Sequence, residues 1–387
     1  MQLRRRAGGW LLPLAAAALA AGLALPASGA PAGHPEAGAQ AMRRAVRAHA
    51  GALRHRAGAV TVVADHLNNP RGLELAGGAL FVAEAGRGGR TCPFPDTCAG
   101  LTSSITRVAH GHQRRVVTGL PSLAGPDGSF AVGVDDVSAA PGGGLFMIAT
   151  SAGCQPPAGL QPGLRRQLGR LLRAGGGRKL VVADVSAFEC AHDPDGRGPD
   201  TDPYAVLALS RRHQVVADAA GNSVLDVRDG VVSLLAVLPQ SQGGRDPVPT
   251  SVVRGPDGAY YVGTLAEGAG NGGASVWRVA PGQAPQVYVS GLTAVVDLAF
   301  GPDHSLYVSE LTTDLATFSP HGAVVRVRRN GQRTVLGAGS LFYPGGVAVD
   351  RKGRVYVSNW SILPASGAAA AAGFPADARG QVVRLRG

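Results

Sequence analysis

Several residues able to bind ligands or transfer protons stand at the start of short apolar segments that recur along the chain. They are Arg71, Asp135, Asp136, Tyr204, Thr250 and Asp297. Two more polar residues, Glu84 and Asn359, end the apolar segments that come next. Carboxylates gathered away from water are costly unless a cation or an arginine compensates them. The set therefore predicts a ligand-binding centre, with Asp136 and Asp297 as candidate metal ligands and no catalytic residue assigned.

The elements that must position these residues are visible between Val248 and Val308, where one pattern occurs twice. In each copy a short β-branched or aromatic segment leads through a turn into a second such segment. The turns are Gly255-Pro256-Asp257-Gly258 and Gly301-Pro302-Asp303-His304. Proline presets φ in such turns, and Asp and Gly tolerate the tight backbone, so each copy predicts a β-hairpin. Two further strands follow each hairpin, and four antiparallel strands in a repeat are typical of a β-propeller blade.

The same pattern accounts for the rest of the chain after residue 60. Corresponding first-strand positions are Leu73, Val137, Val206, Val252, Leu298 and Val347, with spacings of 64, 69, 46, 46 and 49 residues. Six blades are therefore predicted, with insertions in the first two. The last blade supplies only three strands, whereas Val60–Ala64 has no preceding partner. We predict that Val60–Ala64 completes the last blade and closes an all-β ring, which removes the open sheet edges.

The residues before this propeller (59–387) read as targeting and spacer segments. Residues 1–32 combine a charged start at Arg4-Arg5-Arg6, an apolar run from Trp10 to Leu25 and a small-residue cleavage site near Ala32. This is the pattern of a secretory signal peptide. The apolar run is shorter than the ~20 residues of a spanning helix, which disfavours a membrane anchor. Residues 33–58 are rich in Ala and Arg and are predicted to be a disordered spacer.

Charge argues against a nucleic-acid partner. The formal net charge is +11, but residues 1–58 hold eight Arg and one acidic residue, so the rest of the chain is nearly balanced. Nucleic-acid binding needs a concentrated basic face. Lysine is rare, and Lys179 and Lys352 are its two positions. We expect an exported monomer, secreted or in the cell envelope, with no transmembrane segment after signal cleavage and with an unknown small molecule or envelope protein as partner.

Four cysteines, Cys92, Cys98, Cys154 and Cys190, favour two disulfides in an exported chain. Three pairings are open on the sequence alone. We predict that neighbours pair, Cys92 with Cys98 and Cys154 with Cys190.

A second candidate metal site lies in the acidic segment between residues 193 and 202. Its possible ligands are Asp193, Asp195 and Asp202, whose alternation around a glycine resembles a calcium loop. Ala191 occupies the expected first ligand position, and Arg197 places a positive charge in the middle. A solvated turn is therefore the favoured interpretation, and Ca²⁺ is the candidate cofactor.

Several segments resemble, in order, the ScyD/ScyE family of secreted propellers. They are Leu67-Asn68-Asn69-Pro70-Arg71-Gly72-Leu73, Phe81-Val82-Ala83-Glu84-Ala85-Gly86, the Cys92 to Cys98 loop, Leu168-Gly169-Arg170-Leu171, Ala183-Asp184-Val185-Ser186-Ala187-Phe188-Glu189, Asp202-Pro203-Tyr204 and Pro249-Thr250-Ser251-Val252-Val253. In addition, residues 215–224 resemble an NHL-type repeat. The resemblance covers about residues 60–387. It implies export and a propeller fold but no settled activity.

Two function classes remain open. We predict a binding or scaffolding module of undefined ligand, and the alternative is a Ca²⁺-dependent hydrolase or lactonase acting in the central funnel. Lactonases of the SMP-30 type use a Glu and Asn residues where this chain has either Pro70 or Arg71, and Val296, so their ligand set is missing here. The sequence also contains no Gly-x-Ser-x-Gly or HExxH motif. A role as an accessory protein in a pigment pathway rests on the family resemblance alone.

Overall fold

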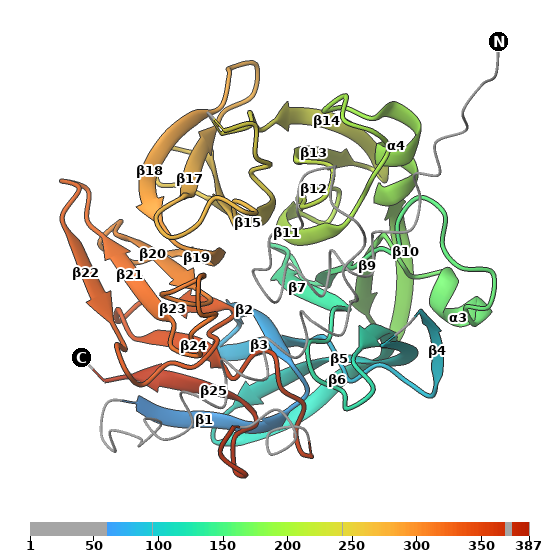
Figure 1. Ribbon diagram of the computed structural model, residues 1–387, viewed down its shortest axis with the longest axis horizontal. Helices are drawn as coiled ribbons and strands as arrows, with labels where there is room; N and C mark the ends of the chain where they lie inside the picture. Colours follow the sequence, from blue (N-terminus) through green and yellow to red (C-terminus); the bar gives the residue numbers. More distant parts are fainter. Residues whose placement is uncertain (1–59, 95, 242, 368–373, 387) are drawn as a thin grey trace.

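Six antiparallel sheets surround a central axis, as the computed structural model shows in Figure 1. The structure describes residues 60–94, 96–241, 243–367 and 374–386. The prediction of an all-β, six-bladed propeller is confirmed. The predicted signal peptide (1–32) and spacer (33–58) lie outside the described residues. Within the described ranges, no helix is long and apolar enough to cross a membrane.

Each blade runs from an inner strand at the axis to an outer strand at the rim (Figure 1). Blade 1 contains β2 (Pro70–Ala76), β3 (Ala79–Glu84), β5 (Thr97–Ala109) and β6 (His112–Ala124), with β4 (Thr91–Phe94) added beside β5. Blade 2 contains β7 (Val134–Ala139), β8 (Leu145–Ala149), β9 (Arg170–Gly175) and β10 (Arg178–Asp184). Blade 3 contains β11 (Pro203–Ser210), β12 (His213–Asp218), β13 (Ser223–Arg228) and β14 (Val231–Val237).

The remaining blades repeat this order. Blade 4 contains β15 (Pro249–Arg254), β16 (Tyr260–Thr264), β17 (Ala274–Val279) and β18 (Gln286–Leu292). Blade 5 contains β19 (Val295–Phe300), β20 (Leu306–Glu310), β21 (Ala323–Val327) and β22 (Arg333–Leu336). Blade 6 contains β23 (Val347–Val349), β24 (Val355–Asn359) and β25 (Gly380–Leu385), with β1 (Val60–Leu67) as its outer strand.

The ring closes through β1, as predicted. β1 pairs antiparallel with β25, from Val60 opposite Leu385 to Leu67 opposite Gly380. Figure 1 shows the two strands side by side at the bottom of the view. The guanidinium of Arg379 donates to both carboxylate oxygens of Asp65, at 2.9 and 2.8 Å. The first and last strands of the propeller are thus held by a backbone ladder and an ion pair.

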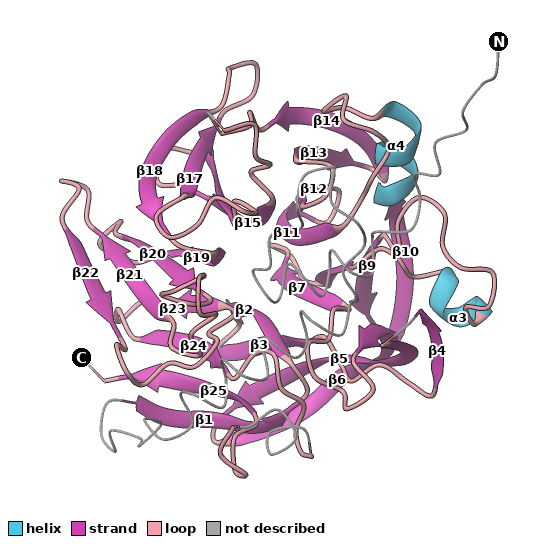
Figure 2. Ribbon diagram, in the orientation of Figure 1, coloured by secondary structure: helices cyan, strands magenta, loops and turns pink. Residues whose placement is uncertain are grey.

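The two insertions contain structure for which the sequence made no detailed prediction. In the first, β5 and β6 extend over 13 residues each. The second insertion contains two short helices, α3 (Pro162–Arg165) and α4 (Val185–His192), at the rim in Figure 2. α4 begins where the carboxylate of Asp184 accepts the amide of Ala187, which satisfies one of the free donors of a helix start.

The predicted disulfide pairing is confirmed. Cys92 bonds to Cys98 within the β4–β5 hairpin, and Cys154 bonds to Cys190 of α4. The second disulfide therefore fastens α4 to the loop that follows β8.

One apolar cluster covers the end of the axis where the first strands begin, and we call it the apolar cap. Its buried members are Ala219, Val248, Leu265, Ala294, Val296, Leu311, Phe318, Phe342, Tyr343, Trp360, Ile362, Leu363 and Phe374. These residues come from loops of blades 3 to 6, and the rings of Phe342 and Trp360 stack with centroids 4.6 Å apart. Burying a large apolar side chain contributes roughly 1.5–3 kcal/mol. The cap therefore holds the loops of several blades together.

Candidate functional site

A small polar cavity lies on the axis, directly beside the apolar cap. Six of the eight predicted ligand-binding residues line it: Arg71, Asp135, Asp136, Tyr204, Thr250 and Asp297. Val296 lines the cavity and also belongs to the cap. The cavity measures about 10 Å³, which is close to the minimum that one water molecule needs. The structure thus brings most of the predicted residues together, but around a very small space.

Two of these carboxylates join the inner strands of neighbouring blades. Asp136 of blade 2 accepts the amide of Val137 at 2.8 Å and that of Val206, in blade 3, at 2.9 Å. Asp297 of blade 5 accepts the amides of Leu298 and of Val347, in blade 6, both at 2.8 Å. Each carboxylate therefore uses one oxygen on its own strand and the other on the next blade.

Close packing around Asp136 extends to the blade on its other side. A Cβ at Gly72, in β2, would lie 2.1 Å from Asp136 Oδ1. Only a residue without a side chain fits there, so the glycine lets blade 1 approach the carboxylate.

Hydroxyl groups make similar connections at other blade boundaries. Thr250 donates to the carbonyl of Val295 at 2.7 Å and so links blade 4 to blade 5. Ser358 donates to the carbonyl of Arg71 at 2.7 Å and links blade 6 to blade 1. The polar residues of the axis thus act repeatedly as connectors between blades.

Burial disfavours the charged form of the axial carboxylates. It raises the pKa of Asp136 to about 7, although the amide hydrogen bonds oppose this shift. Burial and the nearby Asp136 together raise the pKa of Asp297 well above its usual range. Glu74, which sequence reasoning missed, has its pKa raised to about 8 by burial and by Asp136. These groups therefore hold protons more tightly in the folded protein than in the unfolded chain.

Arg71 and Asp135 form the one corner of the cavity with unused hydrogen-bonding capacity. Arg71 Nη2 donates to the carbonyl of Ala131 at 2.5 Å, but its Nε makes no hydrogen bond and lies 3.7 Å from Asp135 Oδ1. Asp135 Oδ1 is also buried without a hydrogen bond. Burial raises the pKa of Asp135 to about 6, against the lowering effect of Arg71. This corner could hold a water molecule or a small polar group.

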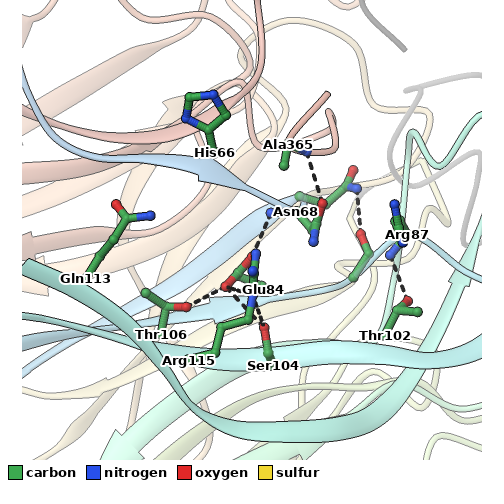
Figure 3. A network of polar contacts seen from close by, with 12 residues as sticks. His66, Asn68, Glu84, Arg87, Thr102, Ser104, Thr106, Gln113, Arg115 and Ala365 are labelled. Carbon is green, nitrogen blue, oxygen red and sulfur yellow. Dashed lines mark hydrogen bonds and ion pairs between the residues drawn. The ribbon is translucent and has the colours of Figure 1, made fainter. Parts of the chain in front are cut away.

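Glu84, one of the two predicted residues outside the cavity, belongs to a network within blade 1 (Figure 3). Its carboxylate accepts the amide of Asn68 at 2.7 Å and the hydroxyls of Ser104 and Thr106 at 3.1 and 2.5 Å. Arg115 donates to both of its oxygens, at 3.0 and 2.7 Å. The Glu84 side chain is fully buried, so these partners replace the water that it gives up.

Asn359, the other residue outside the cavity, caps a loop in the same way. Its Oδ1 accepts the amide of Phe342 at 2.6 Å. Glu310 and Asp218, which end the second strands of blades 5 and 3, accept the amides of Thr293 and Asp202, both at 2.7 Å. The last residue of the second strand thus satisfies the amide of the loop that enters the first strand of its own blade.

The acidic segment at residues 193–202 directs its carboxylates to different partners. Asp193 accepts the amide of Gly198 at 3.1 Å, and Asp195 accepts the side-chain amide of Asn222 at 2.9 Å. Asp202 accepts the hydroxyl of Thr150 at 2.7 Å. Asp202 is 8% exposed, so the interpretation as a solvated turn is wrong for this residue. In the part of the chain that the structure describes, no group of three or more His, Cys, Asp or Glu side chains could hold a metal ion.

Glu189 is a further buried acid that sequence reasoning missed, because it lies on the unpredicted helix α4. Its Oε1 accepts the hydroxyl of Ser223, and its Oε2 is buried without a hydrogen bond. Burial, followed by the charge of Asp218, raises the pKa of Glu189 to about 8. The signal that could have found it is Asp184, a helix-capping residue ahead of the segment.

Comparison with known proteins identifies no family for this chain. No family model and no curated protein matches this chain. Similar solved structures include a streptogramin B lyase, with 12% identity over 78% of this chain and 80% of the other and a TM-score of 0.48. They also include virginiamycin B lyase from Staphylococcus aureus, with 13% identity over 78% and 83% and a TM-score of 0.48. Regucalcin from Agrobacterium tumefaciens, described as calcium-binding, has 12% identity over 85% and 93% and a TM-score of 0.48.

The chain is a β-propeller. At these identities and scores the likeness concerns the fold alone, and membership of the ScyD/ScyE family stays a prediction.

Proposed function

We propose that this protein is an exported binding or scaffolding propeller that engages its partner through an outer surface. The observation that carries the proposal is the use of Asp136 and Asp297. Both oxygens of each carboxylate accept a backbone amide. Asp136 joins blades 2 and 3 in this way, and Asp297 joins blades 5 and 6. The residues that most suggest an active centre thus serve to hold the ring together. The two disulfides are compatible with a location outside the cytosol, in the envelope or beyond the cell.

The axial cavity also suits catalysis poorly. A space of about 10 Å³ excludes any organic substrate, and binding pockets for small molecules usually measure ~300–1,000 Å³. A cation at Asp136 or Asp297 would have to displace backbone amides, because both oxygens of each carboxylate already accept one.

The second candidate function is a Ca²⁺-dependent hydrolase or lactonase acting at the axis. The observation that favours it is the buried pair formed by Arg71 Nε and Asp135 Oδ1, neither of which makes a hydrogen bond. A substrate oxygen or a water molecule between them would satisfy both. Because the pKa of Asp135 is raised to about 6, this carboxyl could exchange a proton near neutral pH.

Metal content and melting temperature separate the two functions. The mature, chelator-washed protein and its Asp136→Asn and Asp297→Asn variants would be analysed for bound metal and melted with and without Ca²⁺. The binding-module proposal expects no stoichiometric ion, no shift with Ca²⁺, and lower melting temperatures for both variants. About one ion per chain that raises the melting temperature and is lost in both variants would overturn it. An ion lost only on Asp193→Asn or Asp195→Asn would assign calcium to the acidic segment instead.

A further inference from the structure

A large cleft opens between blades 1 and 2, at the end of the strands opposite to the apolar cap. Its volume is about 810 Å³, which lies in the range of binding pockets for small molecules. One wall is formed by β6 and the β2–β3 turn, and the other by the turns that join β7 to β8 and β9 to β10. The cleft is therefore separate from the axial cavity and shares no lining residue with it.

The floor of the cleft is apolar. Phe81, Val116 and Leu145 line it and pack against the buried core between blades 1 and 2. The turns at the rim contain glycines, among them Gly143, Gly144, Gly176 and Gly177, so no side chain covers the floor from these positions. An apolar floor left uncovered in this way favours contact with an apolar ligand.

One cation, Lys179, stands at one side of this floor. Lys179 Nζ donates to the carbonyls of Thr118 and Gly119, in blade 1, at 2.7 and 2.8 Å. An ammonium group has three donors, so one remains for a ligand. Arg178 also lines the cleft, but it precedes Lys179 in β10, and successive side chains of a strand point to opposite faces. Among the described residues that line the cleft none is acidic, so the positive charge is not neutralised inside it.

We propose that this cleft binds an amphipathic anion, a small molecule with an apolar body and a carboxylate or similar group at one end. The apolar body would lie on Phe81, Val116 and Leu145, and the anionic group would reach Lys179. The inference rests on the proposed function, because it names the class of ligand that a binding propeller would hold. It gives Lys179 a role beyond the contact between blades.

Decanoate, well below its micellar concentration, is a suitable probe, and calorimetry would measure its affinity. Ala139→Phe fills the cleft from β7, because Ala139 lines the cleft and stands opposite Leu145 of its floor in the β7–β8 ladder. Ala158→Phe is the matched control, since Ala158 is exposed and lies outside the cleft. We expect one decanoate site per chain, roughly tenfold weaker in Ala139→Phe and in Lys179→Gln, since a charge-assisted contact is worth about that factor. Ala158→Phe should bind like the unchanged protein.

Lysine chemistry gives a second readout. Since Lys179 and Lys352 are the only lysines, amine labelling followed by mass spectrometry compares the cleft with an internal reference. Partial burial lowers the pKa of Lys179, and a bound anion should raise it again and slow labelling there but not at Lys352.

Three results would overturn the inference: no decanoate binding, equal binding of decyltrimethylammonium, or an unchanged affinity in Ala139→Phe. None of them touches the binding-module proposal, which depends on the metal analysis. Conversely, a metal at the axis would overturn that proposal and leave decanoate binding to be judged by the cleft variants.

Discussion

Replacing Asp297 by alanine tests whether the axial carboxylates connect the blades. The substitution removes the acceptor of two amides, those of Leu298 in blade 5 and Val347 in blade 6. Leaving a buried donor without a partner costs about 1–3 kcal/mol, so two of them cost about 2–6 kcal/mol at most. For a domain of this size, about 1 kcal/mol shifts the melting temperature by roughly 1.5 °C. We therefore expect Asp297→Ala to melt about 3–9 °C lower at pH 5.

The effect of Asp297→Ala on the melting temperature should depend on pH. Since the folded-state pKa of Asp297 is raised, the folded protein binds this proton more tightly than the unfolded chain does. The unchanged protein then loses stability as pH rises from the ordinary aspartate pKa towards the raised one. Alanine has no proton to lose, so the loss of melting temperature in Asp297→Ala should be smaller at pH 8 than at pH 5.

A matched control is Asp303, in the turn between β19 and β20. Its pKa is lowered to about 2 in spite of partial burial, by hydrogen bonds from Ser305 and Arg326 and by the charge of Arg326. A carboxylate with a lowered pKa makes its full contribution to stability at every pH above the pKa of the unfolded chain, and this contribution is lost only at acidic pH. Asp303→Ala should therefore have the same effect at pH 5 and pH 8. Scanning calorimetry of both variants at the two values makes the comparison. An effect of Asp297→Ala that is absent, or that grows towards pH 8, would refute this account of the axis.

Three further changes test the network, the second disulfide and the buried acid of α4. Arg115→Ala should lower the free energy of unfolding by about 2–3 kcal/mol, because it leaves the buried carboxylate of Glu84 without its charged donor. In the double variant Glu84→Gln/Arg115→Ala this loss of stability should be smaller, and chemical denaturation would measure both. Cys154→Ala/Cys190→Ala should cost roughly 4 kcal/mol on the chain-entropy model, and an unchanged melting temperature would contradict a bridge at this place. Glu189→Gln should gain stability relative to the unchanged protein as pH rises from 5 to 8, because the pKa of Glu189 is raised to about 8 and ionising this buried acid destabilises the folded state. A difference in melting temperature between the two proteins that stays the same at every pH would contradict this.

The blades could be predicted because their signals are local. Each hairpin carries its own turn residues, and the apolar segments repeat at nearly constant spacing, so neither the count of blades nor the closing role of β1 needed distant contacts. No element was predicted for the segment that forms α4. Only Asp184 marks it as a helix, and a single capping residue is a weak signal.

The roles of the site residues were harder to predict for a physical reason. Asp136 and Val206 are 70 residues apart, and Asp297 and Val347 are 50 apart. A sequence can place a carboxylate at the axis, but it does not tell which distant amide fills its acceptors. Glu84 was placed correctly at the end of a strand, but the sequence did not show that Arg115 contacts its carboxylate from β6, two strands away in the same blade.

The closing strand has a consequence for how the protein is made. A ribosome completes β1 before any other strand of the propeller and β25 after all of them, yet these two pair with each other. Until the final residues of β25 emerge, the blades cannot form a closed ring, and the first and last strands of the unfinished propeller expose unpaired backbone groups. The pairing of β1 with β25 also closes a longer loop than any other strand pairing in the ring. It should therefore form more slowly than the local hairpins. A chain that stops short of Gly380 would have no strand to pair with β1, so ring closure itself separates complete chains from truncated ones.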